Sequence, residues 1–232
     1  MDRMSRSYIT KQEELTQISS YVSKQIKSKF GKGPETCFTS ISEQYIVVHI
    51  KKFMTKIEYE LVEKEDIETA ERIRKSIMED LFDPIQETLE ELLCVRITQL
   101  YQDWNFQKNT GVLLAEVVQE ERTPNQNSLE FMLLRNEISR QSEFYQYQPK
   151  ELDLTKIGST VYIIRCAGYL LPIERLLLEK GMHILSEREN RVRHNYIANI
   201  KRFNKITNKE IDDIFMIWNY DKDVSYKVFY CK

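Results

Sequence analysis

The sequence predicts an α+β fold in which one α-β-β-α-β-β unit occurs twice in tandem. Each copy is expected to form a mainly antiparallel four-stranded sheet packed against helices. Three observations lead to this prediction. The 232 residues exceed the common domain size of about 100–150 residues. The two tryptophans, Trp104 and Trp218, lie in matching segments, and helical and strand-like patterns recur in the same order in both halves. We expect a first repeat at 1–118, a linker at 119–126 and a second, divergent repeat at 127–232.

The repeat is visible as identical residue types at a constant spacing. Near the end of each half the offset is 114 residues, and Trp104-Asn105 aligns with Trp218-Asn219. Earlier in the halves the offset is 116 residues, and duplication explains the matches better than chance does. Seven residues of the first half have the same residue type 116 positions later: Ile57, Glu58, Leu61, Glu63, Lys64, Glu71 and Arg72.

Each half is predicted to begin with a helix. In the first half, Thr10-Lys11-Gln12-Glu13 reads as a capping box, and apolar residues follow at helical spacing as far as Phe30. The segment Gly31-Lys32-Gly33-Pro34 then ends the helix. In the second half, Asn127-Ser128-Leu129-Glu130 is the analogous start.

Four strands are expected in each half, two after the first helix and two at the end. In the first half they are Thr36–Ser42, Tyr45–Phe53, Arg96–Trp104 and Val112–Val118. In the second half they are Leu152–Ile157, Val161–Cys166, Ile211–Tyr220 and Ser225–Cys231.

A helical region separates the two strand pairs of each half. It starts at a capping box formed by Thr55 and Glu58 in the first half, and at Pro172 followed by Glu174 in the second. Apolar residues from 67 to 92 mark one face of a long helix, which we expect to bend or restart at Asp83-Pro84.

Composition favours a cytoplasmic protein without a metal or a cofactor. The four cysteines are scattered and form no CxxC pair or Cys/His cluster, as is typical of reduced structural thiols. The N-terminus lacks the apolar stretch of a signal peptide. The longest apolar segment, residues 161–173, is shorter than the roughly 20 residues that span a bilayer.

No catalytic constellation is recognisable. His49, His183 and His194 have no Ser, Cys or Asp companion at a spacing that sequence can identify. Capping of the following helix accounts for Glu58 and Glu174.

Three landmarks of the first half resemble the MpsC-like family of bacterial proteins. They are Gly31-Lys32-Gly33-Pro34 after the first helix, Thr55-Lys56-Ile57-Glu58 after the first hairpin, and Asp83-Pro84 before a Glu/Leu-rich helix. The family is named for a cation-translocating, membrane-potential-generating system and usually has one domain of this length. The resemblance implies two tandem copies here and an accessory role beside membrane machinery that handles cations or inorganic carbon.

The second half departs from the family pattern at two places. It has lost the Gly-Lys-Gly-Pro sequence. The family's Asp-Ile-Ser-Thr stretch is represented by Asp103-Trp104-Asn105-Phe106 in the first half, whereas 217–220 has lost the Asp. Any function of the Gly31–Pro34 loop therefore survives in one copy at most.

Three groups of residues are candidates for contacts. Gly31 to Pro34 reads as a helix end, with an anion or acidic partner as the alternative, since phosphate loops precede helices rather than follow them. The repeated hairpin end, with Trp104 and Trp218, reads as aromatic packing, with an exposed anchor for a partner as the alternative. A basic helical face comprises Arg188, Arg191, Arg193, Lys201 and Arg202. A partner protein or a membrane surface suits these charges as well as nucleic acid does, and no nucleic-acid module is recognisable.

We therefore expect an interaction or regulatory module rather than an enzyme, with a protein partner. The alternative is a small-molecule-binding protein or enzyme whose site lies between the repeats. Residues 65–91 hold 10 Asp/Glu and three Lys/Arg, whereas 181–205 holds two Glu and six Lys/Arg. This opposite charge predicts a monomer with an internal pseudo-two-fold axis, or a weak dimer.

Overall fold

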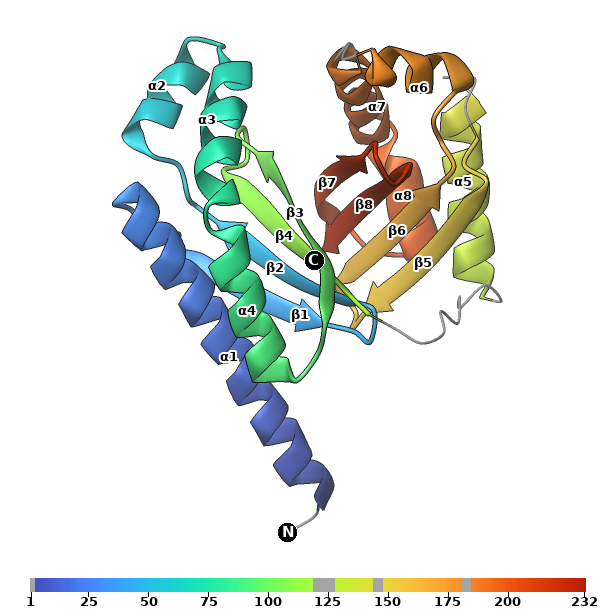
Figure 1. Cartoon of the computed structure of the whole chain (residues 1–232). Coiled ribbons are helices and arrows are strands. Elements are labelled where there is room, and N and C mark those ends of the chain that lie inside the picture. Colours follow the sequence, from blue (N-terminus) through green and yellow to red (C-terminus); the bar gives the residue numbers. More distant parts are fainter. Residues whose placement is uncertain (1–2, 119–127, 144–147, 181–184) are drawn as a thin grey trace. The chain divides into compact units, whose positions relative to one another are not determined.

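The computed structural model describes residues 3–118, 128–143, 148–180 and 185–232 (Figure 1). The chain divides into two compact units, Met1–Glu121 and Arg122–Lys232. The first unit contains α1 (Arg3–Phe30), β1 (Thr36–Ile41), β2 (Tyr45–Lys51), α2 (Lys56–Glu63), α3 (Ile67–Glu79), α4 (Phe82–Leu93), β3 (Ile97–Asn105) and β4 (Thr110–Val117). The second contains α5 (Leu129–Glu143), β5 (Glu151–Ile157), β6 (Val161–Ala167), α6 (Pro172–Glu179), α7 (Ser186–Ala198), α8 (Ile200–Thr207), β7 (Ile211–Asn219) and β8 (Val224–Cys231).

The two units share one sheet topology, which confirms the predicted α+β tandem fold. Both sheets are antiparallel throughout, with the orders β1-β2-β4-β3 and β5-β6-β8-β7. Local irregularities repeat as well. A bulge interrupts β3 between Ile97 and Gln99, and another interrupts β7 between Ile211 and Asp213. Each bulge lies at the same place in its strand.

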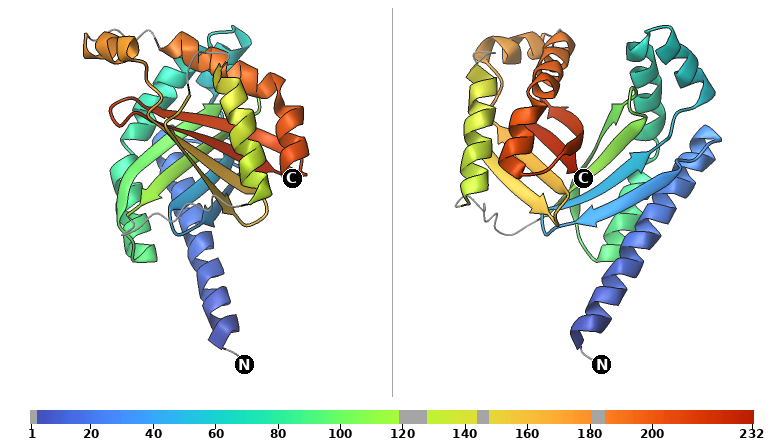
Figure 2. Two further views of the ribbon diagram at one scale, coloured as in Figure 1. Left: turned by 90° about the vertical axis from the view of Figure 1, so that its right-hand side faces the viewer. Right: turned by 180° about the vertical axis from the view of Figure 1, so that it is seen from behind.

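Helices cover one face of each sheet, as Figures 1 and 2 show. In the first unit, α1 packs beside β1 and α4 beside β3. The strand residues that face these helices alternate, as the period of two requires. Between sheet and helices lie buried side chains that include Ile18, Val22 and Ile26 of α1, Ile46, Val48 and Ile50 of β2, and Ile85 and Leu89 of α4. In the second unit the same layer contains Phe131, Leu134 and Ile138 of α5 and Phe203 of α8.

The sequence prediction of the first helix start was wrong, and the prediction of a bend or restart in the long helix was close. The first helix begins at Arg3, ahead of the Thr10 capping box. The expected long helix is two helices, α3 and α4, which separate at Asp80-Leu81. Pro84 lies in the first turn of α4, where its missing N–H costs nothing, so it does not cause the break.

The remaining boundaries fall close to the predicted ones. Ser128 accepts a hydrogen bond from the Phe131 N–H (3.1 Å) at the start of α5. The proposed linker, 119–126, lies outside the described residues, and the internal two-fold axis stays a prediction.

Candidate interaction site

A buried ion pair fixes α2 against α3 in the first unit. The Arg74 Nε donates to Glu58 Oε1 (2.6 Å), and its Nη2 donates to Glu58 Oε2 (2.5 Å) and to the Phe53 carbonyl oxygen (3.0 Å). The Arg74 and Glu58 side chains are 1% and 2% exposed. Such two-pronged binding satisfies both carboxylate oxygens and joins the start of α2 to the middle of α3.

Three aromatic rings surround the Arg74 guanidinium. Its Cζ lies 4.7 Å from the ring centre of Phe53 and 4.5 Å from those of Trp104 and Phe106. The faces of aromatic rings are electronegative and attract a cation. The rings therefore offset part of the free energy that the guanidinium loses on leaving water. Through Trp104 they also connect the ion pair to β3.

Neighbouring residues position Glu58 and one of the rings around Arg74. Thr55 caps α2, since its hydroxyl accepts from the Glu58 N–H (3.3 Å), while Glu58 Oε2 accepts from the Thr55 N–H (2.7 Å) and hydroxyl (2.8 Å). Gly111 makes room for Trp104, because a Cβ at position 111 would lie 2.0 Å from Trp104 Cε3.

The environment keeps Glu58 ionised. Burial by itself raises the pKa of Glu58, but hydrogen bonds and charge from Arg74, together with hydrogen bonds from Thr55, outweigh it and lower the pKa below its usual value. A carboxylate held in this way serves positioning rather than proton transfer.

The second unit repeats the arrangement with looser packing. Glu174 accepts from the Leu171 N–H (2.9 Å) and pairs with Arg188. The Arg188 Cζ lies 5.7 Å from the Tyr169 ring centre, and this ring meets Trp218 edge-on at 5.4 Å. The Arg188 side chain is 16% exposed. The same chemistry therefore joins α6 to α7, with more access for water.

Arg188 corresponds to Arg74 in structure, although the sequence offset matched it to Arg72. Both Arg74 and Arg188 bind the glutamate in the first turn of the preceding helix, so the change of offset from 116 to 114 comes before them. The sequence match around the two tryptophans instead places the shift near the ends of the halves. The signal that could have located it is the spacing of arginine relative to Trp104 and Trp218, which is the same in both halves.

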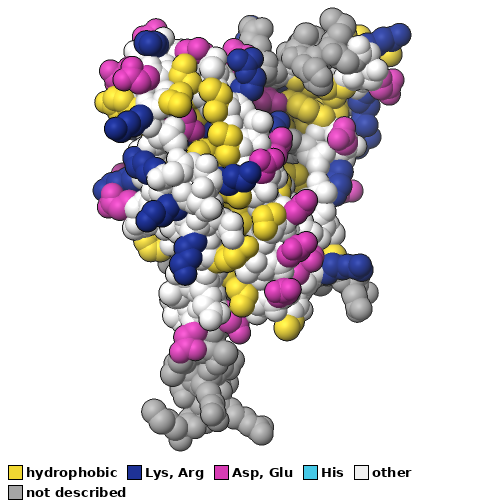
Figure 3. Space-filling model, turned by 60° about the vertical axis from the view of Figure 1, so that its left-hand side comes forward, with side chains coloured by type: hydrophobic (Ala, Val, Ile, Leu, Met, Phe, Trp, Pro, Cys, Tyr) yellow, Lys and Arg dark blue, Asp and Glu magenta, His cyan; other side chains and the backbone are white. Residues whose placement is uncertain are grey.

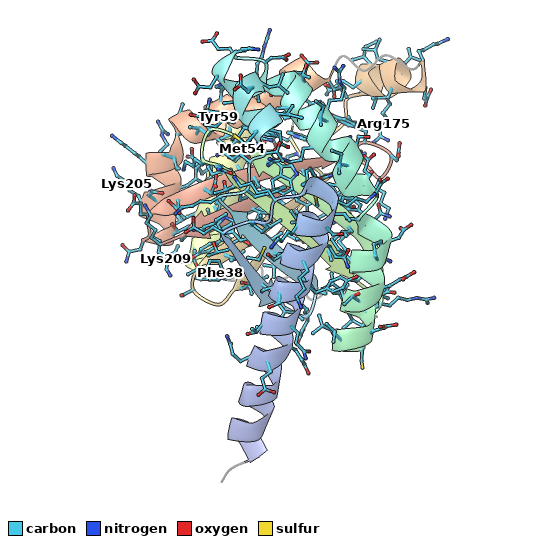
Figure 4. The ribbon with its side chains drawn as sticks, turned by 90° about the vertical axis from the view of Figure 1, so that its left-hand side faces the viewer. Phe38, Met54, Tyr59, Arg175, Lys205 and Lys209 are labelled. Atoms are coloured by element: carbon cyan, nitrogen blue, oxygen red, sulfur yellow. The ribbon has the colours of Figure 1, made fainter. Side chains whose placement is uncertain are left out.

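The opposite side of α2 exposes apolar residues. Ile57 is 68% exposed and Tyr59 is 58% exposed. In the second unit, Ile173 and Leu176 of α6 are 57% and 48% exposed. Ile57 and Ile173 occupy equivalent positions, each directly before the paired glutamate. Tyr59 lies on the outer side of α2 in Figure 4.

Charged residues of both signs, with acidic ones in excess, surround the apolar ones on α2, where Lys56 and Lys64 are exposed as well. Glu60, Glu63, Glu65 and Asp66 are exposed at and just beyond the end of this helix. Figure 3 shows hydrophobic side chains between charged ones in the upper part of this face, where α2 and α3 lie. We call Ile57, Tyr59, Glu60 and Glu63 the α2 surface.

The Gly31–Pro34 loop ends α1 and contacts the segment before α2. Gly31 has φ +71°, a left-handed conformation that glycine adopts without strain. Lys32 Nζ donates to the Met54 carbonyl oxygen (2.8 Å). The loop is thus held close to the α2 N-terminus in the described structure.

The five predicted basic residues do not form one surface. Arg188 turns inward to Glu174, and Arg193 Nη2 donates to the Met216 carbonyl oxygen of β7 (3.5 Å). Arg191, Lys201 and Arg202 are exposed. The helix carrying them is also interrupted, because α7 ends at Ala198 and α8 begins at Ile200.

The repeated hairpin end is a packing element in both units. Trp104 is 6% exposed and Trp218 half-buried, which contradicts the exposed-anchor alternative. Asn105 accepts from the Lys108 N–H (3.0 Å), and Asn219 accepts from the Lys222 N–H (3.0 Å), so the same side-chain bond shapes both turns. Asp103 lies on the other face of β3, opposite Val112.

Groups with metal-binding or nucleophilic chemistry are dispersed. Within the ranges that the structure describes, no cluster of His, Cys, Asp and Glu could hold a metal ion. The four thiols are free, and His183 falls outside those ranges. No described helix is long and apolar enough to cross a membrane.

Fold and site together define a duplicated α+β domain in which a buried Glu–Arg pair holds a short helix with an exposed aliphatic face. Residues 10–118 match the family described as Na+-translocating membrane potential-generating system (MpsC). The first repeat therefore belongs to the MpsC family. No curated protein and no solved structure matches the chain.

Proposed function

We propose that the protein is a cytoplasmic interaction or regulatory module that catalyses no reaction. In this proposal it binds a protein of a membrane cation-transport system through the outer faces of α2 and α6. The family of the first repeat supports the setting, because its description names a Na+-translocating system. The second repeat would be a divergent MpsC-like copy.

The observation that carries the proposal is the exposure of equivalent isoleucines on two fixed helices. Ile57 and Ile173 are 68% and 57% exposed, and each adjoins a glutamate held by an arginine, which is buried in the first unit and partly buried in the second. Helices held in this way present their outer side chains without a large ordering cost on binding. An apolar residue on a rigid element is therefore a suitable anchor for a partner.

Charge indicates what kind of segment the α2 surface binds. Exposed acidic residues around Ile57 and Tyr59 outnumber the two exposed lysines, Lys56 and Lys64. A complementary segment therefore carries an excess of Lys or Arg beside its apolar residues. Loops of membrane proteins on the cytoplasmic side are rich in Lys and Arg. We expect the partner segment to be such a loop or terminus.

A photo-crosslinking experiment tests this proposal in the native host. A photoreactive phenylalanine analogue replaces Tyr59 in the full chain, and a second chain carries it at Met132, which is exposed to a similar degree (55%). We expect the Tyr59 position to capture a subunit of a membrane cation transporter, through a basic and apolar peptide, and the Met132 position not to do so.

A matched pair of variants controls for non-specific apolar contact. Ile57→Ser should abolish the adduct, whereas Leu129→Ser, at a residue that is 70% exposed, should leave it unchanged. Equal adducts from both crosslinker positions, or an adduct indifferent to Ile57→Ser, would contradict the proposal.

A further inference from the structure

β1 is the outer strand of the first sheet and has an open edge. The order β1-β2-β4-β3 places it at one end. It pairs with β2 on one side, and in the described part of the chain no strand pairs with its other side.

Hydrogen bonding shows which backbone groups face that edge. The Ser42 N–H donates to the Tyr45 carbonyl oxygen (2.8 Å), and Ile41 lies opposite Ile46. In an antiparallel pair the bonded residues alternate along the strand. The N–H and C=O groups of Cys37, Thr39 and Ile41 therefore point outward, away from β2.

A groove of about 480 Å³ runs along this edge, between β1 and α1. Its lining is rich in hydroxyl groups: Thr16, Ser19, Ser20 and Ser23 from α1, and Thr36 and Thr39 from β1. Ser19 Oγ and Thr39 Oγ1 are hydrogen-bonded to each other (2.7 Å). The α1 residues recur at helical spacing, so the hydroxyls follow the strand along its length.

The other face of the same edge presents an aromatic ring. Phe38, labelled in Figure 4, alternates with Cys37 and Thr39 along β1, so its side chain lies toward the other face of the sheet. It is 56% exposed and also borders the groove. A large apolar side chain exposed beside unpaired backbone groups is what sheet edges usually avoid, because it invites another strand.

We propose that the β1 edge is a strand-addition site, which binds an extended segment of a partner protein. An extended backbone offers N–H and C=O groups at the spacing of those on Cys37, Thr39 and Ile41, whereas a helix has its own already bonded. Side chains of the added strand alternate between two environments. Small hydroxyl-bearing residues face the Ser and Thr lining under α1, and apolar residues cover Phe38.

This site is independent of the interaction proposed for α2. Its lining shares no residue with the α2 surface, and it recognises backbone rather than charge. Either proposal can therefore fail while the other holds.

Selection from a phage-displayed library of random 12-residue peptides on the full-length protein tests the strand-addition site. We expect enriched peptides that alternate hydroxyl-bearing and apolar residues. On binding, amide exchange at Cys37, Thr39 and Ile41 should slow by about 10-fold or more, because these N–H groups acquire partners. Exchange at Phe38 and Ser40, already bonded to β2, should change little.

Two variants at one position separate backbone recognition from side-chain effects. Thr39→Pro removes an outward N–H and should weaken peptide binding about 10-fold or more, whereas Thr39→Val keeps that N–H and should change binding about twofold or less. If Thr39→Pro proves too unstable, Phe38→Lys replaces it, with Phe38→Leu as the control. An empty selection, peptides that bind Thr39→Pro as well as wild type, or protection that misses β1 would each overturn the proposal.

Discussion

Arg74 and Glu58 bind each other at both carboxylate oxygens inside the first repeat, where their side chains are 1% and 2% exposed. The two residues are 16 positions apart in the chain. Their contact is thus tertiary, and it holds α2 against α3. Ile57 directly precedes Glu58, so this contact also determines where the exposed Ile57 side chain lies.

Breaking the pair should destabilise the first repeat strongly. Arg74→Met leaves Glu58 buried without a counter-charge, which typically costs about 3–5 kcal/mol, and Glu58→Gln should cost a similar amount. The double variant should cost about 1–3 kcal/mol less than the sum of the two. Chemical denaturation followed by Trp104 fluorescence, in a Trp218→Phe background, measures these values.

The exposed Arg72 provides the control for that cycle. Arg72→Met should stay within about 0.5 kcal/mol of wild type. Additive single variants would show that the Glu58–Arg74 contact contributes little.

The same pair should make the first repeat sensitive to acid. The pKa of Glu58 is lowered in the folded state by Arg74 and Thr55 against the opposing effect of burial. A lowered folded-state pKa gives stability that is present above the unfolded-state pKa, about 4.3. That stability is lost as pH falls through the folded value.

We therefore expect the free energy of unfolding of wild type to decline below about pH 5, and that of Glu58→Gln to decline less steeply there. Denaturation curves at successive pH values give both slopes. Parallel slopes would mean that other carboxylates dominate the acid response.

Sequence predicted the strands and the repeat well because their signals are local. Alternation and turn residues locate β2 and β6, and the capping residues locate the starts of α2 and α6. The Glu58–Arg74 contact carries no local signal. Glu58 was assigned to capping alone, since its second partner depends on how α3 folds back.

The sequence does not distinguish the roles of the basic residues, for a related reason. Arg188 is similar to Arg191 and Arg193 in sequence, and only the position of Glu174 and Tyr169 in space distinguishes its role. The predicted bend or restart at Asp83-Pro84 lies just after the α3–α4 break at Asp80-Leu81, because Pro84 is the stronger sequence signal and the apolar stripe continues across the break.

Gly111→Ala should distort the aromatic cluster around Arg74. The new methyl group would lie 2.0 Å from Trp104 Cε3, so ring or strand must shift. Overpacking of this kind costs about 1–3 kcal/mol. A thermal melt should show the loss, with blunted near-ultraviolet dichroism from Trp104.

Rescue provides the control for this steric reading. Trp104→Leu loses packing, but adding Gly111→Ala to it should cost much less than Gly111→Ala costs in wild type. An equal cost in both backgrounds would assign the effect to the glycine backbone instead.

Thiol labelling should distinguish Cys94 from the other three cysteines. Cys94 is exposed, whereas burial raises the pKa of Cys37 to about 12 and that of Cys231 above its usual value. At pH 8 the Cys37 thiol is therefore almost entirely protonated, and the thiolate is the reactive form. We expect one fast equivalent with an aromatic disulfide reagent and three more after denaturation. Cys94→Ser should remove the fast phase, and a fast phase that survives this change would show that a second thiol opens in the native state.

Arg188 and Arg191 should respond in opposite ways to substitution, although both belong to the basic segment. Arg188→Met leaves Glu174 in a largely buried position without its partner, so it should lower stability. The loss should be smaller than for Arg74→Met, because a side chain that is 16% exposed keeps access to water, unlike one that is 1% exposed. Denaturation followed by Trp218 fluorescence, in a Trp104→Phe background, measures it.

Arg191→Glu should instead leave the melting temperature unchanged, since Arg191 is exposed. Combined with Arg193→Glu, it should reduce any retention on heparin, which we expect to be weak because the basic residues are not gathered on one surface. Arg193→Glu alone monitors the cost of losing the contact to the Met216 carbonyl oxygen. Strong retention that depends on Arg188, with no change in melting temperature, would mean that this arginine binds a polyanion. Its contact with Glu174 would then not be what the fold requires.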